Sequence, residues 1–247
     1  MSLPDDLEAM LVRHGVNDAD RALIAERVAL VLDDRNVFST EDELIAWIEG
    51  YRNDSSIVVT EKPVNQLRHW RVDPATGTIA HDTGEFFSII GVEISNADRE
   101  VAGWDQPVVH QKEMGVLGII RCRFEGTWHY LLNAKAEPGN TLLYQISPTL
   151  QATYSNLRQA HAGRRPRFAE YFEDDAGYEV VYRQWLAEDG GRFYLKSNLN
   201  MLVEVTPEQL PDSIPDDFRW FTLSQIKSLL RRDNYINPHV RGILCHL

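Results

Sequence analysis

Apolar residues recur every three to four positions through the first part of the chain. This spacing predicts three helices, over residues 4–14, 19–32 and 40–51. Asp18 is a plausible N-cap for the second helix, and Ser39 or Thr40 for the third. The third helix has an apolar face, which is typical of a helix that packs on its own core: Leu44, Ile45, Trp47 and Ile48. We therefore expect a helical N-terminal segment over residues 1–60.

From Leu67 the hydrophobic period approaches two, which is typical of strands. The predicted strands span residues 85–95, 116–124, 128–134, 142–146, 178–186, 192–196 and 201–205. The sequence DPATG at residues 73–77 predicts a hairpin turn. Two short helices follow, one opened by a capping box from Thr222 to Gln225 and one by Asn237-Pro238. Strands flanked by helices at both ends indicate an α+β fold, with residues 61–247 as its main domain.

Composition narrows the class of protein. The chain of 247 residues carries 25 basic and 37 acidic side chains, a net charge of -12, which argues against a nucleic-acid surface. Cys122 and Cys245 lack the spacing of a zinc or disulfide framework, so we expect no metal site. The sequence also lacks a signal-peptide pattern and an apolar run of membrane-spanning length. These features predict a cytoplasmic protein with no membrane partner.

Polar side chains are concentrated in two segments that also contain strand-like apolar runs. The first is KAEPGNTLLYQISPTLQATYSN, residues 135–156, where turns at 138–140 and 147–149 bracket a short apolar run. The second is GRFYLKSNLNMLVEV, residues 191–205, where Lys196, Asn198 and Asn200 share one face of a predicted strand. An inward lysine in a strand is costly unless it meets an anion. Both segments are therefore candidates for a ligand site.

These segments resemble the NDP-hexose 2,3-dehydratases. The likeness extends to GEFFSIIGV at residues 84–92, to WDQP at 104–107 and to WFTLSQIKSLLRRDNYIN at 220–237, so it runs from about Trp70 to the C-terminus. It implies a Nudix-like α/β/α sandwich. The glutamate cluster of the Nudix signature is absent from the sequence, so pyrophosphate hydrolysis is not expected.

The resemblance implies a β-elimination on a nucleoside-diphosphate 4-keto-6-deoxyhexose, expected to be dTDP-linked. A base removes the proton on C3, a donor stabilises the enolate, and an acid protonates the hydroxyl that leaves C2. This chemistry needs no redox cofactor, and none is expected. The 3,4-diketo product is labile, so an NADPH-dependent 3-ketoreductase is the expected downstream partner.

The sequence departs from the family pattern in three respects. Family members usually carry two tandem copies of this unit, whereas this chain shows one, which predicts a homodimer. Ser197 and Leu199 occupy positions where the family has basic residues that could face a diphosphate. Two further patches are reduced to LAED at residues 186–189 and Pro-His-Val at 238–240, with only Glu188 and Arg241 retained.

Glu137 and His161 are the first candidates for the acid and base, because both lie in the resembling block beside its turns. A carboxylate in an EPGN turn can instead cap backbone amides, and a histidine can simply bind backbone. The remaining candidates would contact the substrate: Trp70, His81, Phe87, Lys135, Tyr144, Gln145, Ser147, Thr149, Gln151, Ser155, Asn156, Glu188, Lys196, Asn198, Asn200 and Arg241.

Two other functions stay open at this point. One is a different elimination or tautomerisation on a ketone that lacks the diphosphate, which the loss of basic residues at Ser197 and Leu199 favours. The other is a non-catalytic module that binds a sugar nucleotide or a protein. Fold does not decide among these functions, so the choice depends on the site.

Overall fold

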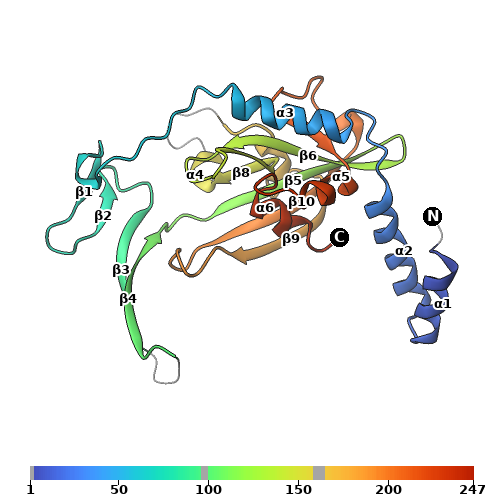
Figure 1. Ribbon diagram of the computed structural model, residues 1–247, viewed down its shortest axis with the longest axis horizontal. Helices are drawn as coiled ribbons and strands as arrows, with labels where there is room; N and C mark the ends of the chain where they lie inside the picture. Colours follow the sequence, from blue (N-terminus) through green and yellow to red (C-terminus); the bar gives the residue numbers. More distant parts are fainter. Residues whose placement is uncertain (1–2, 96–99, 158–164) are drawn as a thin grey trace.

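The computed structural model describes residues 3–95, 100–157 and 165–247. The three N-terminal helices are confirmed as α1 (Asp5–Arg13), α2 (Asp18–Leu32) and α3 (Glu41–Asn53). The Asn17 side chain caps α2, one residue before the predicted cap, and Thr40 forms a capping box with Glu43 on α3. In Figure 1, α1 and α2 project from the body, whereas α3 lies along one side of the main sheet. None of the helices among the described residues is long and apolar enough to cross a membrane.

The body is built on a seven-stranded sheet. Its main path runs β11-β6-β5-β10-β9, with β7 paired to β6 and β8 paired to β5. The strands are β5 (Gly115–Phe124), β6 (Thr127–Ala136), β7 (Tyr144–Pro148), β8 (Leu150–Thr153), β9 (Glu179–Ala187), β10 (Ser197–Val205) and β11 (Phe218–Phe221). The pair of β5 and β10 is parallel and the other pairs are antiparallel.

The sheet forks where β5 and β6 separate. These strands pair only from Ile120 and Leu131 to their hairpin, and beyond that point β8 pairs with β5 while β7 pairs with β6. Thr149, between β7 and β8, lies at the fork. Its hydroxyl donates to the Leu131 carbonyl and accepts from the Ile120 amide at 3.0 Å. One side chain thus satisfies the two backbone groups that the separation would leave unpaired.

Side chains alternate between two apolar layers on the faces of the sheet. One face carries Leu117 and Ile119, which join the buried residues of α3, α5 (Leu223–Leu229) and α6 (Pro238–Leu244). The opposite face carries Val116 and Ile120 and packs on the 3-10 helix η2 (Ala169–Phe172). The described residues also form two short 3-10 helices, η1 (Val64–Gln66) and η3 (Pro207–Gln209), and the short helix α4 (Tyr154–Leu157). The α+β class is confirmed.

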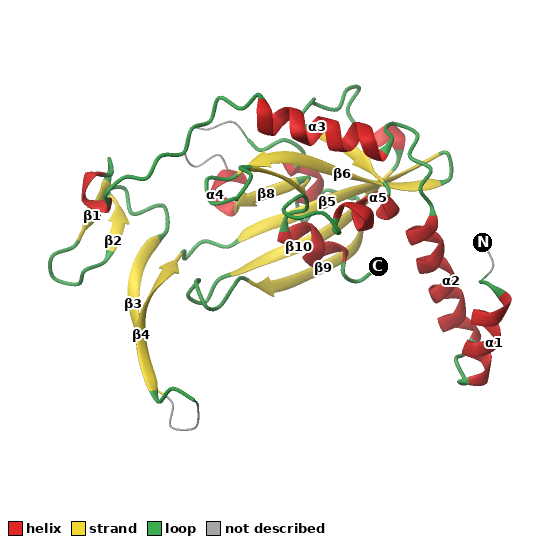
Figure 2. Cartoon of the chain, viewed as in Figure 1, coloured by secondary structure: helices red, strands yellow, loops and turns green. Residues whose placement is uncertain are grey.

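A second sheet forms an arm that extends from the body (Figure 2). It is a four-stranded antiparallel sheet in the order β1 (Trp70–Val72), β2 (Ile79–His81), β3 (Ser88–Ser95) and β4 (Gly103–His110). The predicted turn at residues 73–77 joins β1 to β2, and β3 begins three residues later than expected. Strands β1, β2 and β4 were not predicted. The arm contacts the body through the Tyr194 amide, which donates to the Val109 carbonyl at 2.8 Å.

The strand predicted over residues 192–196 is wrong. These residues form turns, with an isolated bridge at Phe193 and a positive φ of 50° at Leu195. The Asp189 carbonyl accepts from the amides of Arg192 and Phe193, which closes a tight turn at the end of β9. Lys196 therefore precedes β10 and is not part of the strand. Of the three residues predicted to share a strand face, Asn198 and Asn200 lie on one face of β10.

The strand predicted over residues 142–146 is shifted to β7, Tyr144–Pro148. Leu143 adopts a φ of 59° and its carbonyl accepts from the Glu137 amide, so the preceding turn extends to that residue. The turn predicted at 147–149 is instead the bend at the fork, because both flanking strands remain in the sheet.

Candidate active site

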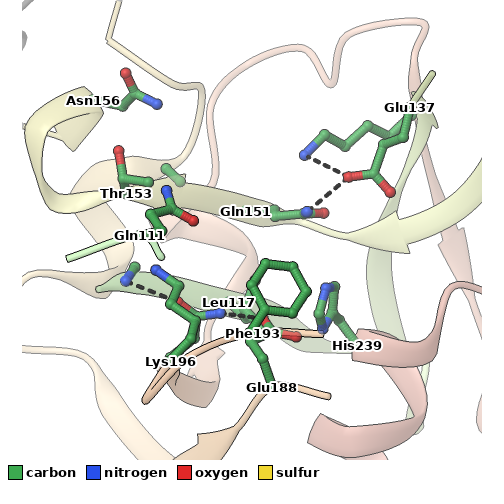
Figure 3. A pocket seen from close by; sticks show the side chains of 14 residues that line it. Gln111, Leu117, Glu137, Gln151, Thr153, Asn156, Glu188, Phe193, Lys196 and His239 are labelled. Carbon is green, nitrogen blue, oxygen red and sulfur yellow. Dashed lines mark hydrogen bonds and ion pairs between the residues drawn. The ribbon is translucent and has the colours of Figure 1, made fainter. Parts of the chain in front are cut away.

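A cavity of about 380 Å³ opens on the sheet where the fork has separated β5 from β6. Its walls come from β5, β6, β8, β10, the turn after β9 and the start of α6 (Figure 3). Seven of the predicted residues line it: Lys135, Glu137, Gln151, Asn156, Glu188, Lys196 and Asn198. The fork brings β8 beside β5, and the parallel pairing of β5 with β10 adds a segment more than eighty residues away in sequence to the same cavity.

Glu137 is held on one wall by three side chains. Its Oε1 accepts from the Gln151 amide at 2.8 Å and lies 3.7 Å from Lys135 Nζ. Its Oε2 accepts from the Asn237 amide at 3.3 Å. Asn237 is buried and donates as well to Gln145 Oε1 at 3.3 Å. These contacts hold the Glu137 carboxyl group in a fixed orientation.

Lys135 stands beside Glu137 on β6 and is half-buried. Burial lowers the pKa of Lys135, whereas the charge of Glu137 and a hydrogen bond to it act in the opposite direction. The ammonium is thus both partly desolvated and paired with the carboxylate. A cation in this position can stabilise negative charge that develops on a bound ligand.

The opposite wall carries a second carboxylate, Glu188 (Figure 3). Its Oε1 accepts from the Asn198 amide, and Asn198 Oδ1 accepts from the Gly115 amide at 2.9 Å. The backbone donor fixes the orientation of the Asn198 amide, so that its NH₂ group must point at Glu188. Asn200 lies behind, where its amide donates to the Asn198 carbonyl at 2.9 Å.

Lys196 reaches the cavity from the same wall, although its side chain is only 6% exposed. Its Nζ donates to the carbonyl of Glu113, in the segment that joins β4 to β5. Burial lowers the pKa of Lys196, against the charges of Glu188 and Glu113, which raise it. Among the described residues, the cavity therefore has a lysine and a carboxylate on each of two opposite walls: Lys135 with Glu137, and Lys196 with Glu188.

Several predicted contacts prove to support the fold around the cavity rather than line it. Ser147 donates to the Gln145 carbonyl at 3.3 Å, and Gln145 accepts from Asn237. Thr149 holds the fork. Tyr144 faces α3, with its ring 5.5 Å from that of Tyr51. These side chains are kept at a distance from the cavity because β7 pairs with the outer half of β6.

The predicted residues Trp70, His81 and Phe87 gather on the arm. The Trp70 ring lies 4.9 Å from Phe87 and 5.6 Å from His81, and His81 Nδ1 also contacts Thr83 Oγ1 at 2.9 Å. His81 and Phe87 line a second cavity of about 440 Å³. Gln111 lines both cavities, so the two adjoin where the arm meets the body.

The other predicted residues are placed as follows. Arg241 is exposed on α6, and Ser155 belongs to α4. His161 lies outside the residues that the structure describes. Leu199 is buried on the face of β10 opposite Asn198, among the residues packed on η2. The Leu199 side chain therefore points away from the cavity, because side chains alternate along a strand.

Sequence reasoning missed four polar or aromatic residues that line the cavity: Gln111, Thr153, Phe193 and His239. It also missed Asn237, whose side chain caps α6 by accepting from the His239 amide at 2.9 Å. The cap was predicted as a helix start, but the second role of its amide depends on tertiary contact with Glu137. His239 lies two residues after the Asn237 cap, in the first turn of α6. Its position in this first turn is the sequence signal that could have identified it as a cavity residue.

The chain matches a family model and curated relatives. A family model described as NDP-hexose 2,3-dehydratase matches residues 41–247. The dTDP-4-dehydro-6-deoxy-alpha-D-glucopyranose 2,3-dehydratase of Amycolatopsis orientalis is 38% identical over 238 residues, which cover 93% of this chain and 49% of the relative. The enzyme of the same name from Saccharopolyspora spinosa is 37% identical over 202 residues, which cover 82% of this chain and 41% of the relative. The chain thus spans about half the length of these relatives, or less.

Among solved structures, the chain is similar to the Ap4A hydrolase of C. elegans, with 14% identity and a TM-score of 0.27 over 48% of this chain and 94% of the hydrolase. A likeness at this level does not carry a fold assignment. The match over residues 41–247 and the identities to two curated relatives do decide the family. The chain belongs to the NDP-hexose 2,3-dehydratase family.

Proposed function

We propose that this protein is a sugar-nucleotide 2,3-dehydratase that eliminates the C2 hydroxyl from a dTDP-4-keto-6-deoxyhexose. The observation that carries the proposal is the cavity of about 380 Å³, in which Glu137 is fixed by Lys135, Gln151 and Asn237. A general base needs such fixed placement to reach one proton of a bound sugar. Membership of the family supplies the class of reaction.

In this mechanism the Glu137 carboxylate removes the proton from C3. The electron pair moves toward C4, and the C4 oxygen becomes an enolate. Lys135, whose Nζ is 3.7 Å from Glu137 Oε1, would stabilise that oxygen, because C4 is bonded to C3. Asn156, Gln111 and Asn198 would bind sugar hydroxyls through their amides. His161 remains the alternative base proposed from the sequence.

The nucleotide would lie toward the arm. The aromatic cavity of about 440 Å³ adjoins the first one at Gln111, and its Phe86 and Phe87 rings are exposed. An exposed aromatic ring can stack on a nucleobase. This arrangement would put the sugar on the sheet and the base beside Phe87, with the diphosphate between them.

Other expectations from the sequence belong to the same proposal. The body would be a Nudix-like α/β/α sandwich, in keeping with α3, α5 and α6 on one face of the mixed sheet and η2 on the other. The chain would divide near residue 60, although Leu44 and Ile48 of α3 belong to the core of the body. It would act in the cytoplasm as a homodimer, and an NADPH-dependent 3-ketoreductase would consume its product.

The deciding experiment incubates the protein with dTDP-4-keto-6-deoxyglucose in deuterated water, with a 3-ketoreductase and NADPH to trap product. We expect loss of water and deuterium at C2, read by mass spectrometry and proton NMR. Glu137→Gln should lower turnover by about 10²–10⁴-fold while thymidine diphosphate still raises the melting temperature. Unchanged substrate with the wild-type protein would contradict the proposal.

The second candidate function, elimination or tautomerisation on a ketone without a diphosphate, rests on the sequence observation that Ser197 stands where the family has a basic residue. Ser197 begins β10 on the strand face of Leu199, opposite Asn198, so the structure adds no support to this candidate. Stabilisation by thymidine diphosphate would count against this candidate, since a ligand that binds only the folded protein raises its stability by mass action.

A further inference from the structure

The two lysines of the cavity differ in a way that the proposed reaction can use. Lys135 is paired with the proposed base, with Nζ 3.7 Å from Glu137 Oε1. Lys196 comes from the opposite wall, is only 6% exposed, and is anchored through Nζ to the Glu113 carbonyl. A buried ammonium retains three donor hydrogens, and one carbonyl engages one of them. Lys196 therefore has donors left for a ligand in the cavity.

The sugar ring provides a matching geometry. C2 and C4 flank C3, so a base directed at the C3 proton has the C4 oxygen on one side and the C2 hydroxyl on the other. With Lys135 beside Glu137 serving the C4 oxygen, a second donor is required at the C2 hydroxyl. Figure 3 shows Lys196 across the cavity from Glu137 and Gln151, next to Glu188.

We propose that Lys196 is the general acid that protonates the departing C2 hydroxyl. This inference rests on the proposed function and adds a residue to it. As the enolate electrons form the C2–C3 double bond, the C2–O bond breaks and a proton moves from Lys196 Nζ to the leaving oxygen, which departs as water. Glu137 then carries the former C3 proton, and Lys196 is a neutral amine.

The same two groups complete the cycle. The elimination leaves an enol with its hydroxyl on C3. Protonated Glu137 exchanges its proton with solvent and then delivers a proton to C2, and the Lys196 amine accepts the proton of the C3 hydroxyl, which gives the 3,4-diketone. Both side chains return to their starting states, and the net change is substrate to product plus water. No co-reactant is required.

The local environment of Lys196 favours this role. Desolvation lowers the pKa of its ammonium, which makes the group a stronger acid than an exposed lysine. The Asn198 amide donates to Glu188 and fixes the orientation of its carboxylate. The charge of Glu188 therefore remains close to the Lys196 ammonium. The alternative, that Lys196 only binds the substrate, predicts different kinetics and can be tested.

The test uses Lys196→Arg, which keeps the positive charge but cannot release a proton at neutral pH. Two substrates are compared, dTDP-4-keto-6-deoxyglucose and its 2-deoxy-2-fluoro analogue, because fluoride leaves without protonation. We expect the variant to lose water elimination by about 10²–10⁴-fold, to retain deuterium exchange at C3, and to release fluoride at close to the wild-type rate. Lys196→Gln, assayed in the same way, covers the case in which arginine is not accommodated.

Two outcomes would overturn the inference. One is a variant that eliminates water as fast as the wild type, and the other is an equal loss of water and fluoride elimination, which would make Lys196 a binding residue. Lys227→Arg, at an exposed position on α5, is the matched control and should change neither rate. If wild-type protein gives neither exchange nor elimination, the proposed function fails instead, so the two failures are distinguishable.

Discussion

His129 illustrates how a single buried ring ties the N-terminal helices to the sheet. Its side chain is completely buried on β6, with Nδ1 donating to the Thr127 carbonyl at 2.9 Å. Nε2 accepts from the Val37 amide, between α2 and α3, at 3.3 Å. This pair of contacts requires a neutral ring, because a protonated ring would have no acceptor. Burial lowers the pKa of His129, although the Thr127 carbonyl and Asp33 oppose the shift.

The sign of the effect on stability follows from this pKa. In the unfolded chain the ring takes up a proton below about pH 6.5, whereas the folded protein resists it, so the stability from His129 is lost as the pH falls below that value. We expect urea unfolding to show a decline between about pH 7 and pH 5 that is shallower in His129→Gln. Exposed His14→Gln is the control. Equal pH dependence in wild type and His129→Gln would contradict the prediction.

At the residue scale, the sequence identifies the segments that form the cavity, but it does not separate the residues that line the cavity from those that support it. Lys135 is predicted because an inward lysine in a strand is costly without an anion, and Glu137 because it lies beside a turn of the resembling block. Thr149 and Gln145 lie in the same polar segment but satisfy backbone and amide groups behind the cavity. Composition alone does not separate these roles, since both use the same donors and acceptors.

The fork between β5 and β6 is the element that creates the site. It lets β8 enter beside β5 and brings Gln151 within 2.8 Å of Glu137. Thr149 is 4% exposed, and its hydroxyl serves the Ile120 amide and the Leu131 carbonyl at once. Without that hydroxyl two buried backbone groups would lack their partner.

We expect Thr149→Val to lower the free energy of unfolding by about 2–6 kcal/mol, from two unsatisfied backbone groups at about 1–3 kcal/mol each. Thr149→Ser retains the hydroxyl and should lose far less. Urea denaturation of both variants provides the measurement. If Thr149→Val and Thr149→Ser lower the free energy of unfolding by the same small amount, the fork does not depend on this hydroxyl.

Elements with a strong internal period were predictable, and those fixed by distant contacts were not. The helices α1 to α3 and the strands β5, β6 and β9 lie within two residues of the bounds predicted from apolar spacing, whereas β10 begins four residues before its predicted start. Strand β4 contains Pro107 and an irregular polar pattern, and it pairs only with β3 among the named strands. The composition of residues 192–196 is typical of a strand. They form a loop because the Asp189 carbonyl accepts from the Arg192 and Phe193 amides, and the Tyr194 amide donates to Val109 of the arm.

At the scale of the whole molecule, the arm and the body leave an apolar groove between them. Its volume is about 660 Å³, and its walls include Trp104 and Val108 of β4 with Phe193, Tyr194 and Leu195 of the loop before β10. Leu195 is 81% exposed and Tyr194 40%. Large exposed apolar surfaces of this kind mark interaction sites. The groove also shares Glu188, Phe193 and Lys196 with the candidate active site.

The homodimer expected from the sequence is therefore predicted to meet at this groove. Light scattering should give about twice the chain mass of 28.3 kDa for the wild type. Leu195→Asp should shift the protein toward the monomer, because a charge in a buried apolar contact is costly. Val12→Asp, at a position 54% exposed on α1, should leave the mass unchanged. A wild-type protein of single-chain mass would exclude the dimer, whereas a dimer unaffected by Leu195→Asp would move the interface away from the groove.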